Sequence, residues 1–202
     1  EKEALELSLL REKVALKMSS DVTEKIRTLA MPDGVFKVVL TRDETIRPRA
    51  TGRDSAQFLF SANLGEEPKE LGVVASGGEL SRLALAIEVL TSRKGSMQTL
   101  IFDEVDTGIS GRTASSVGAL LHLLGQDVQV ITVTHLPQVA AAADHQFLVT
   151  KSLNGQNVVS VVTELDTNGR VEEISRMMGG NVVTEATRQS ALALLKQEGV
   201  KA

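Results

Sequence analysis

Two short, largely apolar segments, each followed at once by polar residues, most constrain the fold of this chain. They are 99–102 and 128–134, and helical patterns lie before, between and after them. Continuous apolar strands between helices are typical of a parallel sheet that helices cover on both faces. The sequence therefore predicts an α/β fold with a largely parallel sheet flanked by helices.

Periodicity and turn residues predict the remaining elements. Helices are expected at 76–90, 112–124, 137–143, 171–178 and 184–197, and further strands at 35–43, 56–62, 147–151 and 158–165. The last two strands flank Asn154-Gly155, which is a typical hairpin turn.

The first 31 residues are predicted to form one long helix. Apolar residues recur there every three or four positions, and neither glycine nor proline occurs before Pro32. This helix is either the end of a coiled coil that enters a globular head or an amphipathic helix packed on its own domain. We therefore divide the chain into a helical stub, 1–31, and a globular part, 32–202. Because the chain opens at Glu1 inside the helical pattern, we expect it to be a fragment of a longer protein.

Composition excludes several classes of function. No apolar run reaches the roughly 18 residues that a membrane-spanning helix needs, so we expect a cytosolic protein without membrane contact. The absence of cysteine rules out disulfides and thiolate metal sites, and the three histidines are scattered along the chain. The net charge of −4 argues against polyanion binding by the chain as a whole.

Any contact with nucleic acid must therefore be local. The polar loop 42–54 carries four arginines, Arg42, Arg47, Arg49 and Arg53. Guanidinium groups neutralise phosphates, so this loop is the candidate DNA contact. The alternative is an ordinary solvated loop.

The first segment with chemical meaning is Ser76, Gly77, Gly78 and Glu79. Serine followed three residues later by glutamate is the pattern of a capping box. Each glycine in a first helical turn costs up to about 1 kcal/mol relative to alanine, however, and capping alone gives no reason for that cost. Bare backbone N–H groups at a helix start bind phosphate, so the glycines favour a phosphate contact.

The second and third segments are the residues that follow the two apolar strands. Asp103 and Glu104 end the first strand, and His135 ends the second. The carboxyl ends of parallel strands meet at one sheet edge, where ligands bind. A carboxylate there can hold Mg²⁺, a second can orient an attacking water, and the histidine can reach a phosphate. Asp106 adds a third carboxylate. The alternatives are a polar loop after the first strand and a structural histidine.

The order of these segments resembles that of the ABC-type ATPases. Ser76–Glu79 looks like their signature motif, in the form typical of SMC-like proteins, and Leu100–Glu104 resembles a Walker B strand with its catalytic glutamate. Val105–Ser110 occupies the position of the D-loop, and His135 matches the switch histidine. The wider strings around these motifs resemble the SMC-like ATPases of bacterial DNA repair, and the resemblance spans residues 1–202.

The resemblance implies the C-terminal lobe of an ABC/SMC-type head, with ATP and Mg²⁺ as cofactors. Asp103 would hold Mg²⁺, Glu104 would polarise the attacking water, and His135 would contact the γ-phosphate. Ser76–Glu79 would reach the ATP held by the second head of a homodimer. The implied partners are an N-terminal lobe that carries the P-loop, the second head and DNA. The implied role is double-strand-break repair and recombination, in the cytoplasm and at the nucleoid.

Two departures from the family pattern bear on this expectation. Ser110 stands where the D-loop usually has aspartate, which puts its contact across the dimer in doubt. The sequence also lacks G-x-x-x-x-G-K-[ST], so it carries half of an active site, and the chain alone should be inactive. The alternative function is a non-enzymatic head-and-coil module that docks a partner lobe or DNA. A transporter ATPase is a weaker rival, since it usually has glutamine at the position of Glu79.

Overall fold

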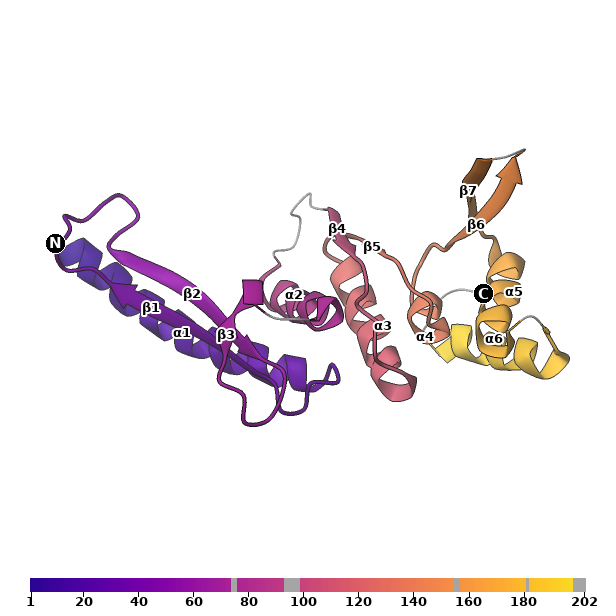
Figure 1. The fold of residues 1–202 in the computed structure, drawn as a ribbon, viewed down its shortest axis with the longest axis horizontal. Coiled ribbons are helices and arrows are strands. Elements are labelled where there is room, and N and C mark those ends of the chain that lie inside the picture. The colour runs from indigo at the N-terminus through magenta and orange to yellow at the C-terminus, as the bar shows by residue number, and fades with distance from the viewer. Residues whose placement is uncertain (74–75, 93–98, 155–156, 181, 198–202) are drawn as a thin grey trace. The chain divides into compact units, whose positions relative to one another are not determined.

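The computed structural model describes residues 1–73, 76–92, 99–154, 157–180 and 182–197. The chain divides into two compact units, Glu1–Thr91 and Ser92–Ala202, and each is described by itself (Figure 1). None of the helices in the described ranges has the length and apolar character needed to cross a membrane.

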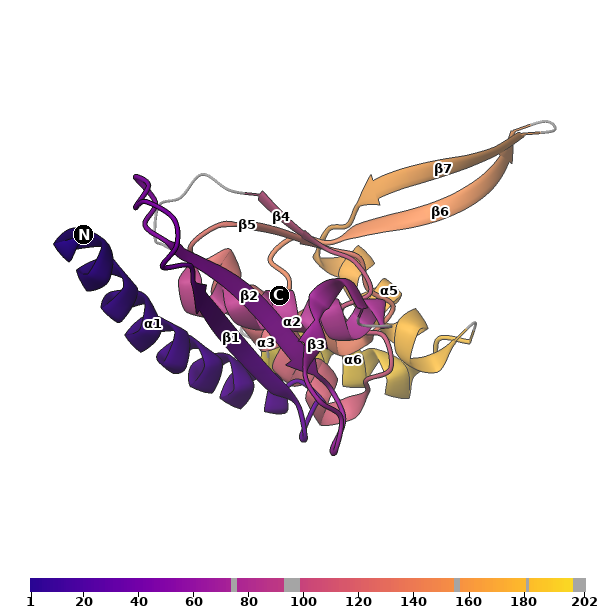
Figure 2. The same ribbon diagram turned by 60° about the vertical axis from the view of Figure 1, so that its left-hand side comes forward.

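The first unit combines two helices with a small antiparallel sheet. Its elements are α1 (Lys2–Arg27), β1 (Val35–Arg42), β2 (Asp54–Ser61), β3 (Lys69–Glu70), the 3₁₀ turn η1 (Leu71–Val73) and α2 (Gly77–Thr91). The strands pair in the order β1-β2-β3. Helix α1 lies along β1, and α2 packs against α1 (Figures 1 and 2).

Helix α1 is shorter than the 31 residues expected from the sequence. It ends at Arg27, and Ala30 then adopts a left-handed conformation with φ of 61°. Leu29, two residues past the helix end, is fully buried, as are Val22 and Ile26 in the helix. The apolar period therefore continues past the helix end because residues there are buried as well.

The two alternatives for this helix concern its different faces. Its buried face packs on the sheet of the same unit, as the second alternative predicts. The N-terminal half also carries exposed large apolar side chains: Leu5, Leu9, Leu10, Val14 and Leu16. A coiled-coil partner would cover such residues. The coiled-coil end, and with it the division at residue 31, stays a prediction.

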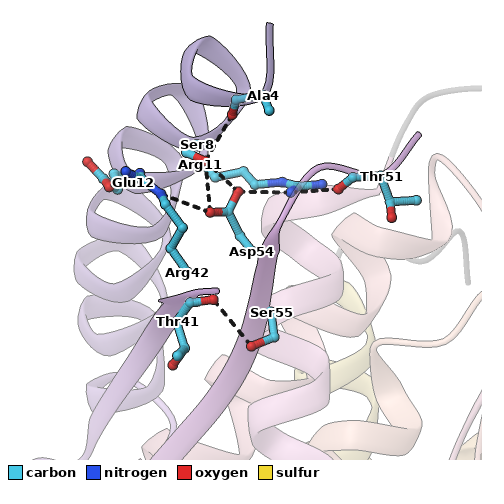
Figure 3. Close-up of polar contacts among 9 residues, drawn as sticks. All are labelled: Ala4, Ser8, Arg11, Glu12, Thr41, Arg42, Thr51, Asp54 and Ser55. Atoms are coloured by element: carbon cyan, nitrogen blue, oxygen red, sulfur yellow. Dashed lines mark hydrogen bonds and ion pairs between the residues drawn. The ribbon is translucent and has the colours of Figure 1, made fainter. Parts of the chain in front are cut away.

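A buried carboxylate fixes α1 to the sheet (Figure 3). The side chain of Asp54, at the start of β2, is 4% exposed and accepts hydrogen bonds from Ser8 Oγ on both oxygens, at 2.8 and 2.9 Å. Arg11 Nη1 lies 3.0 Å from Oδ2, and Arg42 Nε lies 3.4 Å from Oδ1. The Ser8 hydroxyl, followed by the two guanidinium groups, holds the pKa of the Asp54 carboxyl below its ordinary value, although burial opposes this.

A tight turn just before β2 brings the backbone up to α1. Gly52 has φ of 78°, and a Cβ there would lie 3.0 Å from Arg11 Nη1 and 3.1 Å from a Leu7 methyl carbon. Arg11 Nη1 also donates to the carbonyl oxygen of Thr51 at 2.9 Å. Glycine is therefore required both by the backbone conformation and by the close approach.

The second unit begins with a strand–helix–strand segment. Its elements are β4 (Thr99–Phe102), α3 (Gly111–Gly125), β5 (Gln129–Thr132), α4 (Pro137–Ala141), β6 (Phe147–Asn154), β7 (Asn157–Glu164), α5 (Thr167–Gly179) and α6 (Glu185–Gln197). Strands β4 and β5 pair in parallel, with Phe102 opposite Thr132. Their carboxyl ends therefore lie at the same edge, as the sequence predicts.

The sheet differs in detail from the expected one. Among the described strands only β4 and β5 are parallel, and the other pairings are antiparallel. The β4–β5 pair is also not covered on both faces, because Ile101, Ile131 and Val133 are 70%, 47% and 60% exposed. Phe102, which points to the opposite face, is buried. The apolar pattern predicts that both faces of the strand pair are suited to burial. It does not tell whether the residues that cover each face belong to this chain.

The C-terminal part of the unit is a helical cluster with a projecting hairpin. Ala141, Ile174 and Leu195, from α4, α5 and α6, share its core. Strands β6 and β7 form the expected hairpin, which extends away from α5 and α6 (Figure 2), while the residues of its turn, 155–156, lie outside the described ranges. Val149 and Val162 are opposite each other in the register, and both are exposed.

Candidate functional site

The signature-like segment forms the start of α2. Ser76 precedes the helix, its Oγ accepts a hydrogen bond from the Glu79 N–H at 3.4 Å, and its carbonyl oxygen accepts one from the Leu80 N–H at 3.1 Å. Ser76 therefore makes the capping contact that its spacing predicts. Gly77 is exposed and Gly78 is buried. The first N–H groups of any helix lack partners within the helix, so a phosphate contact at this end stays a prediction.

A buried arginine lies one turn further along α2 and was not singled out from the sequence. Arg82 is 5% exposed. Burial lowers the pKa of its guanidinium, and the negative charge of Glu79 acts in the opposite direction. The spacing of three residues between the two on a helix is the signal that could have identified the pair.

Asp103 and Glu104 form a sharp turn directly after β4. Both residues are exposed, and Asp103 Oδ1 accepts a hydrogen bond from the Glu104 N–H at 2.9 Å. Glu104 has φ of 58°, a left-handed conformation that costs a non-glycine residue on the order of 1–3 kcal/mol. Its carbonyl oxygen accepts from the Thr107 N–H at 3.0 Å, which closes the turn. Strain of this kind occurs mostly where function requires a particular side-chain direction.

His135 follows β5 at the same edge of the strand pair. The Val133 N–H donates to the carbonyl oxygen of Phe102 at 3.0 Å, so the parallel pairing continues to the last residue of β4. The imidazole of His135 is 72% exposed. The structure thus brings the carboxylates and the histidine to one edge, which the sequence predicted from parallel strands alone.

Asp106, the third carboxylate of this segment, is not exposed as Asp103 and Glu104 are. Its side chain is 3% exposed and turned toward the residues after β5. Asp106 Oδ2 accepts hydrogen bonds from the Thr134 hydroxyl and from the His135 N–H, the latter at 3.1 Å. In the part of the chain that the structure describes, no group of three acidic, histidine or cysteine residues could hold a metal.

Ser110 lies directly before α3 with an extended backbone, φ of −160°, and is exposed. Its side chain makes no capping hydrogen bond, although its carbonyl oxygen accepts from the Ala114 N–H at 3.5 Å. A role of Ser110 across a dimer stays a prediction. Ser76–Glu79 belongs to the first unit, and Asp103, Glu104, Ser110 and His135 belong to the second.

The four arginines of the loop do not form one solvated set. Arg42 pairs with Glu12 at 2.8 Å as well as with Asp54, and Arg53 pairs with Glu1 at 2.5 Å. The side chains of Arg42 and Arg53 are accordingly only 27% and 16% exposed. The acidic partners Glu1 and Glu12 lie at the beginning of the chain and in α1, far from the loop in the sequence. The remaining two candidates, Arg47 and Arg49, are exposed.

Comparison with known sequences finds relatives along nearly the whole chain. No protein-family model matches. The chain is 44% identical over 192 residues to the DNA repair protein RecN of Haemophilus influenzae, which covers 95% of this chain and 34% of that protein. It is 38% identical over 208 residues to RecN of Bacillus subtilis, covering 96% of the chain and 36% of that protein. The chain thus spans about a third of the length of these relatives.

Comparison with solved structures concerns the fold. The Smc head domain from Pyrococcus yayanosii superimposes with a TM-score of 0.57 at 19% identity, over 84% of this chain and 30% of that one. A chain from a study of ATP-driven dimerization and DNA stimulated activation of SMC ATPases gives a TM-score of 0.50 at 15% identity, over 87% of this chain and 98% of that one. The expected fold class is confirmed as that of an SMC-type head. The resemblance to SMC-like DNA repair proteins is confirmed as well. This chain is similar to RecN proteins along nearly all of its own length, and it corresponds to about a third of the length of those proteins.

Proposed function

We propose that this chain supplies the metal-binding, water-orienting and signature groups of an ATP-hydrolysing head in a RecN-like DNA repair protein. The observation that carries the proposal is the parallel register of β4 and β5. It brings Asp103, Glu104 and His135 to one edge of the strand pair, in the order that ATPases of this kind use.

The residues present fit a magnesium site that nucleotide completes. Mg²⁺ usually takes one or two carboxylates and fills its remaining positions with water and substrate phosphates. Asp103 offers an exposed oxygen ligand at the end of β4, and Asp106 is turned away. Bound there, Mg²⁺ would neutralise negative charge on the phosphate oxygens.

In the proposed reaction Glu104 orients the water that attacks the γ-phosphate. Its side chain is exposed in the turn after β4, where it would accept a hydrogen bond from that water. His135, largely exposed beside it, contacts an oxygen of the γ-phosphate. Chemistry of this kind depends on positioning and electrostatic stabilisation, so each group should matter strongly.

The remaining half of the site is proposed to come from an N-terminal lobe of the same protein. This sequence has no P-loop, and it covers only about a third of its RecN relatives. The exposed face formed by Ile101, Ile131 and Val133 supports the proposal, because apolar strands of a parallel sheet are normally covered on both faces. We propose that the P-loop lobe covers this face.

The signature segment is proposed to act on the nucleotide of a second head. Ser76–Gly78 would present the N-terminus of α2 to the phosphates of ATP held by the partner of a homodimer. A structural neighbour whose description is ATP-driven dimerization of SMC ATPases supports this arrangement. Closing and opening of the two heads would then be coupled to DNA engagement in the cytoplasm, at the nucleoid, with Arg47 and Arg49 as the candidate contacts.

The test is the substitution Glu104→Gln in the full-length protein. We expect ATP binding to be kept and steady-state ATP hydrolysis to fall by about 10²- to 10⁴-fold, as for loss of a positioned general base. Glu67→Gln, which neutralises an exposed carboxylate in a loop of the first unit, is the matched control and should hydrolyse ATP as the wild type does. Unchanged turnover in Glu104→Gln would exclude Glu104 as the catalytic carboxylate.

One alternative has specific support. The missing P-loop and the exposed leucines of α1 also suit a non-enzymatic module that docks a partner lobe, a coil or DNA. Mixing this chain with the P-loop-bearing remainder of the protein separates the two functions. Hydrolysis that appears only in the mixture, and disappears with Glu104→Gln, supports the ATPase, whereas a complex that binds DNA and no ATP supports the module.

A further inference from the structure

A single buried carboxylate oxygen organises the turn that carries His135. Asp106 Oδ2 accepts hydrogen bonds from the Thr134 hydroxyl and the His135 N–H, and His135 Nδ1 lies 3.4 Å from the same oxygen. Thr134 Oγ1 in turn accepts a hydrogen bond from the Leu136 N–H at 3.1 Å. Three consecutive residues after β5 are thus held, directly or through one hydroxyl, by one oxygen of Asp106.

This arrangement constrains the imidazole as well as the backbone. Nδ1 lies 3.4 Å from the buried carboxylate, so Nε2 is the ring nitrogen that is left to meet a ligand. The ring is 72% exposed, so packing contributes little to fixing its direction. Contact with Asp106 supplies the orientation that packing does not.

We propose that Asp106 is a positioning residue for His135, which sets the ring direction and presents Nε2 to the phosphate. The proposal rests on the function proposed above, and it assigns a role to Asp106, a residue of the D-loop-like segment Val105–Ser110. A buried carboxylate is costly unless hydrogen bonds and charge compensate it, and an apolar side chain would fill the same space at no such cost. The donors to Asp106 that the structure shows, the Thr134 hydroxyl and the His135 N–H, lie on the turn that carries the histidine.

The competing explanation is that Asp106 only ties two loops together for stability. In that case its removal lowers the stability of the fold but leaves the turnover of the folded protein unchanged. The effect of removing the Asp106 side chain is then also the same whether residue 135 is histidine or alanine. The two explanations therefore differ in the kinetics and in the coupling between the two residues.

A double-mutant cycle in the full-length protein tests the proposal. Asp106→Ala should lower kcat for ATP hydrolysis by about 10- to 100-fold, the range found when partners that orient a functional histidine are removed, with KM changed by less than about 3-fold. In the His135→Ala background the same substitution should have no further effect on kcat. An equal fold-loss in both backgrounds would overturn the proposal.

Asp106→Asn keeps the test decisive if the alanine variant does not fold. Its amide oxygen can still accept the His135 N–H, but its charge is lost, so we expect a smaller fall in kcat that also disappears in the His135→Ala background. An unchanged kcat with a lower unfolding temperature would show a purely structural role and overturn the proposal. Glu104→Gln separates the two hypotheses, because its turnover reports on the proposed function whatever position 106 does.

Discussion

Each of the two units holds an aspartate whose side chain is almost fully buried, and the two carboxylates are compensated in different ways. The side chains of Asp54 and Asp106 are 4% and 3% exposed. Asp54 has two guanidinium groups, those of Arg11 and Arg42, within 3.4 Å. Asp106 has a hydroxyl, a backbone N–H and the imidazole of His135.

The difference indicates two roles: Asp54 stabilises the fold, whereas Asp106 orients a side chain. Permanently charged partners compensate Asp54 at every pH near neutrality, and they come from the helix and strand that it joins. The partners of Asp106 are consecutive residues of one exposed turn. Equal burial therefore says little about the role of a carboxylate, whereas the charge and location of its partners say more.

The largest expected effect on stability comes from removing the Asp54 carboxylate. Asp54→Ala leaves Arg11 and Arg42 without their shared partner, so we expect the largest loss of stability, a fall of several degrees in the thermal unfolding midpoint. Faster amide hydrogen exchange in the first half of α1 should accompany it. The turnover of the folded full-length protein should not change.

The matched control for that substitution is Asp21→Ala, which removes an exposed pair with Lys17 on the same helix. Surface pairs of this kind contribute little, so hydrogen exchange in α1 should stay as in the wild type. Equal effects of Asp54→Ala and Asp21→Ala would mean that the Asp54 network does not hold α1.

Acid should weaken the α1 junction in a graded way. The Ser8 hydroxyl, with Arg11 and Arg42, holds the pKa of Asp54 below its unfolded value of about 3.9, so the stabilisation is fully present above that pH. It is lost as the pH falls through the lower folded value, because the unfolded state then binds the proton more readily. Protection of the α1 amides, which is the intrinsic exchange rate at each pH divided by the observed rate, should fall in the wild type between pH 6 and pH 2.5 and show a weaker pH dependence in Asp54→Asn.

The smallest expected effect on the fold comes from the exposed arginines. Replacing Arg47 and Arg49 together by glutamine should leave the unfolding midpoint unchanged, since both are exposed. If they contact DNA as proposed, the salt slope of DNA binding by the full-length protein should fall by about 2, one unit for each lost phosphate contact. An unaltered slope removes the loop as a DNA contact. Arg42→Gln, by contrast, should loosen the α1 junction.

Local sequence signals predicted most of the elements and the edge that carries the site. Strand β4 has the expected bounds, and β5 ends two residues earlier than expected. The meeting of Asp103 and His135 at one edge followed from a general property of parallel strands, which needs no knowledge of side-chain contacts. The turn after Phe102 was expected, but the left-handed conformation of Glu104 was not, because nothing in the residue type favours it.

Features that depend on distant partners were not predictable in the same way. Arg42 appeared solvated in the sequence because its partner Glu12 lies 30 residues away on α1. Asp106 appeared to be one more carboxylate beside Asp103, and its direction depends on donors 28 and 29 residues further along the chain. Spacing shows which residues could be neighbours, whereas burial and the actual donors decide where a charged side chain points.

The attachment of α1 at two places has a mechanical consequence. Near its beginning Ser8 bonds Asp54, and 14 residues further on Val22 lies in the core, so the two attachments are about 20 Å apart along the helix axis. A rod attached at one point can swivel, but a rod attached at two separated points transmits torque to whatever holds it. A force that twists or tilts the start of α1 is therefore transmitted to β1 and β2, because the helix and these strands rotate together.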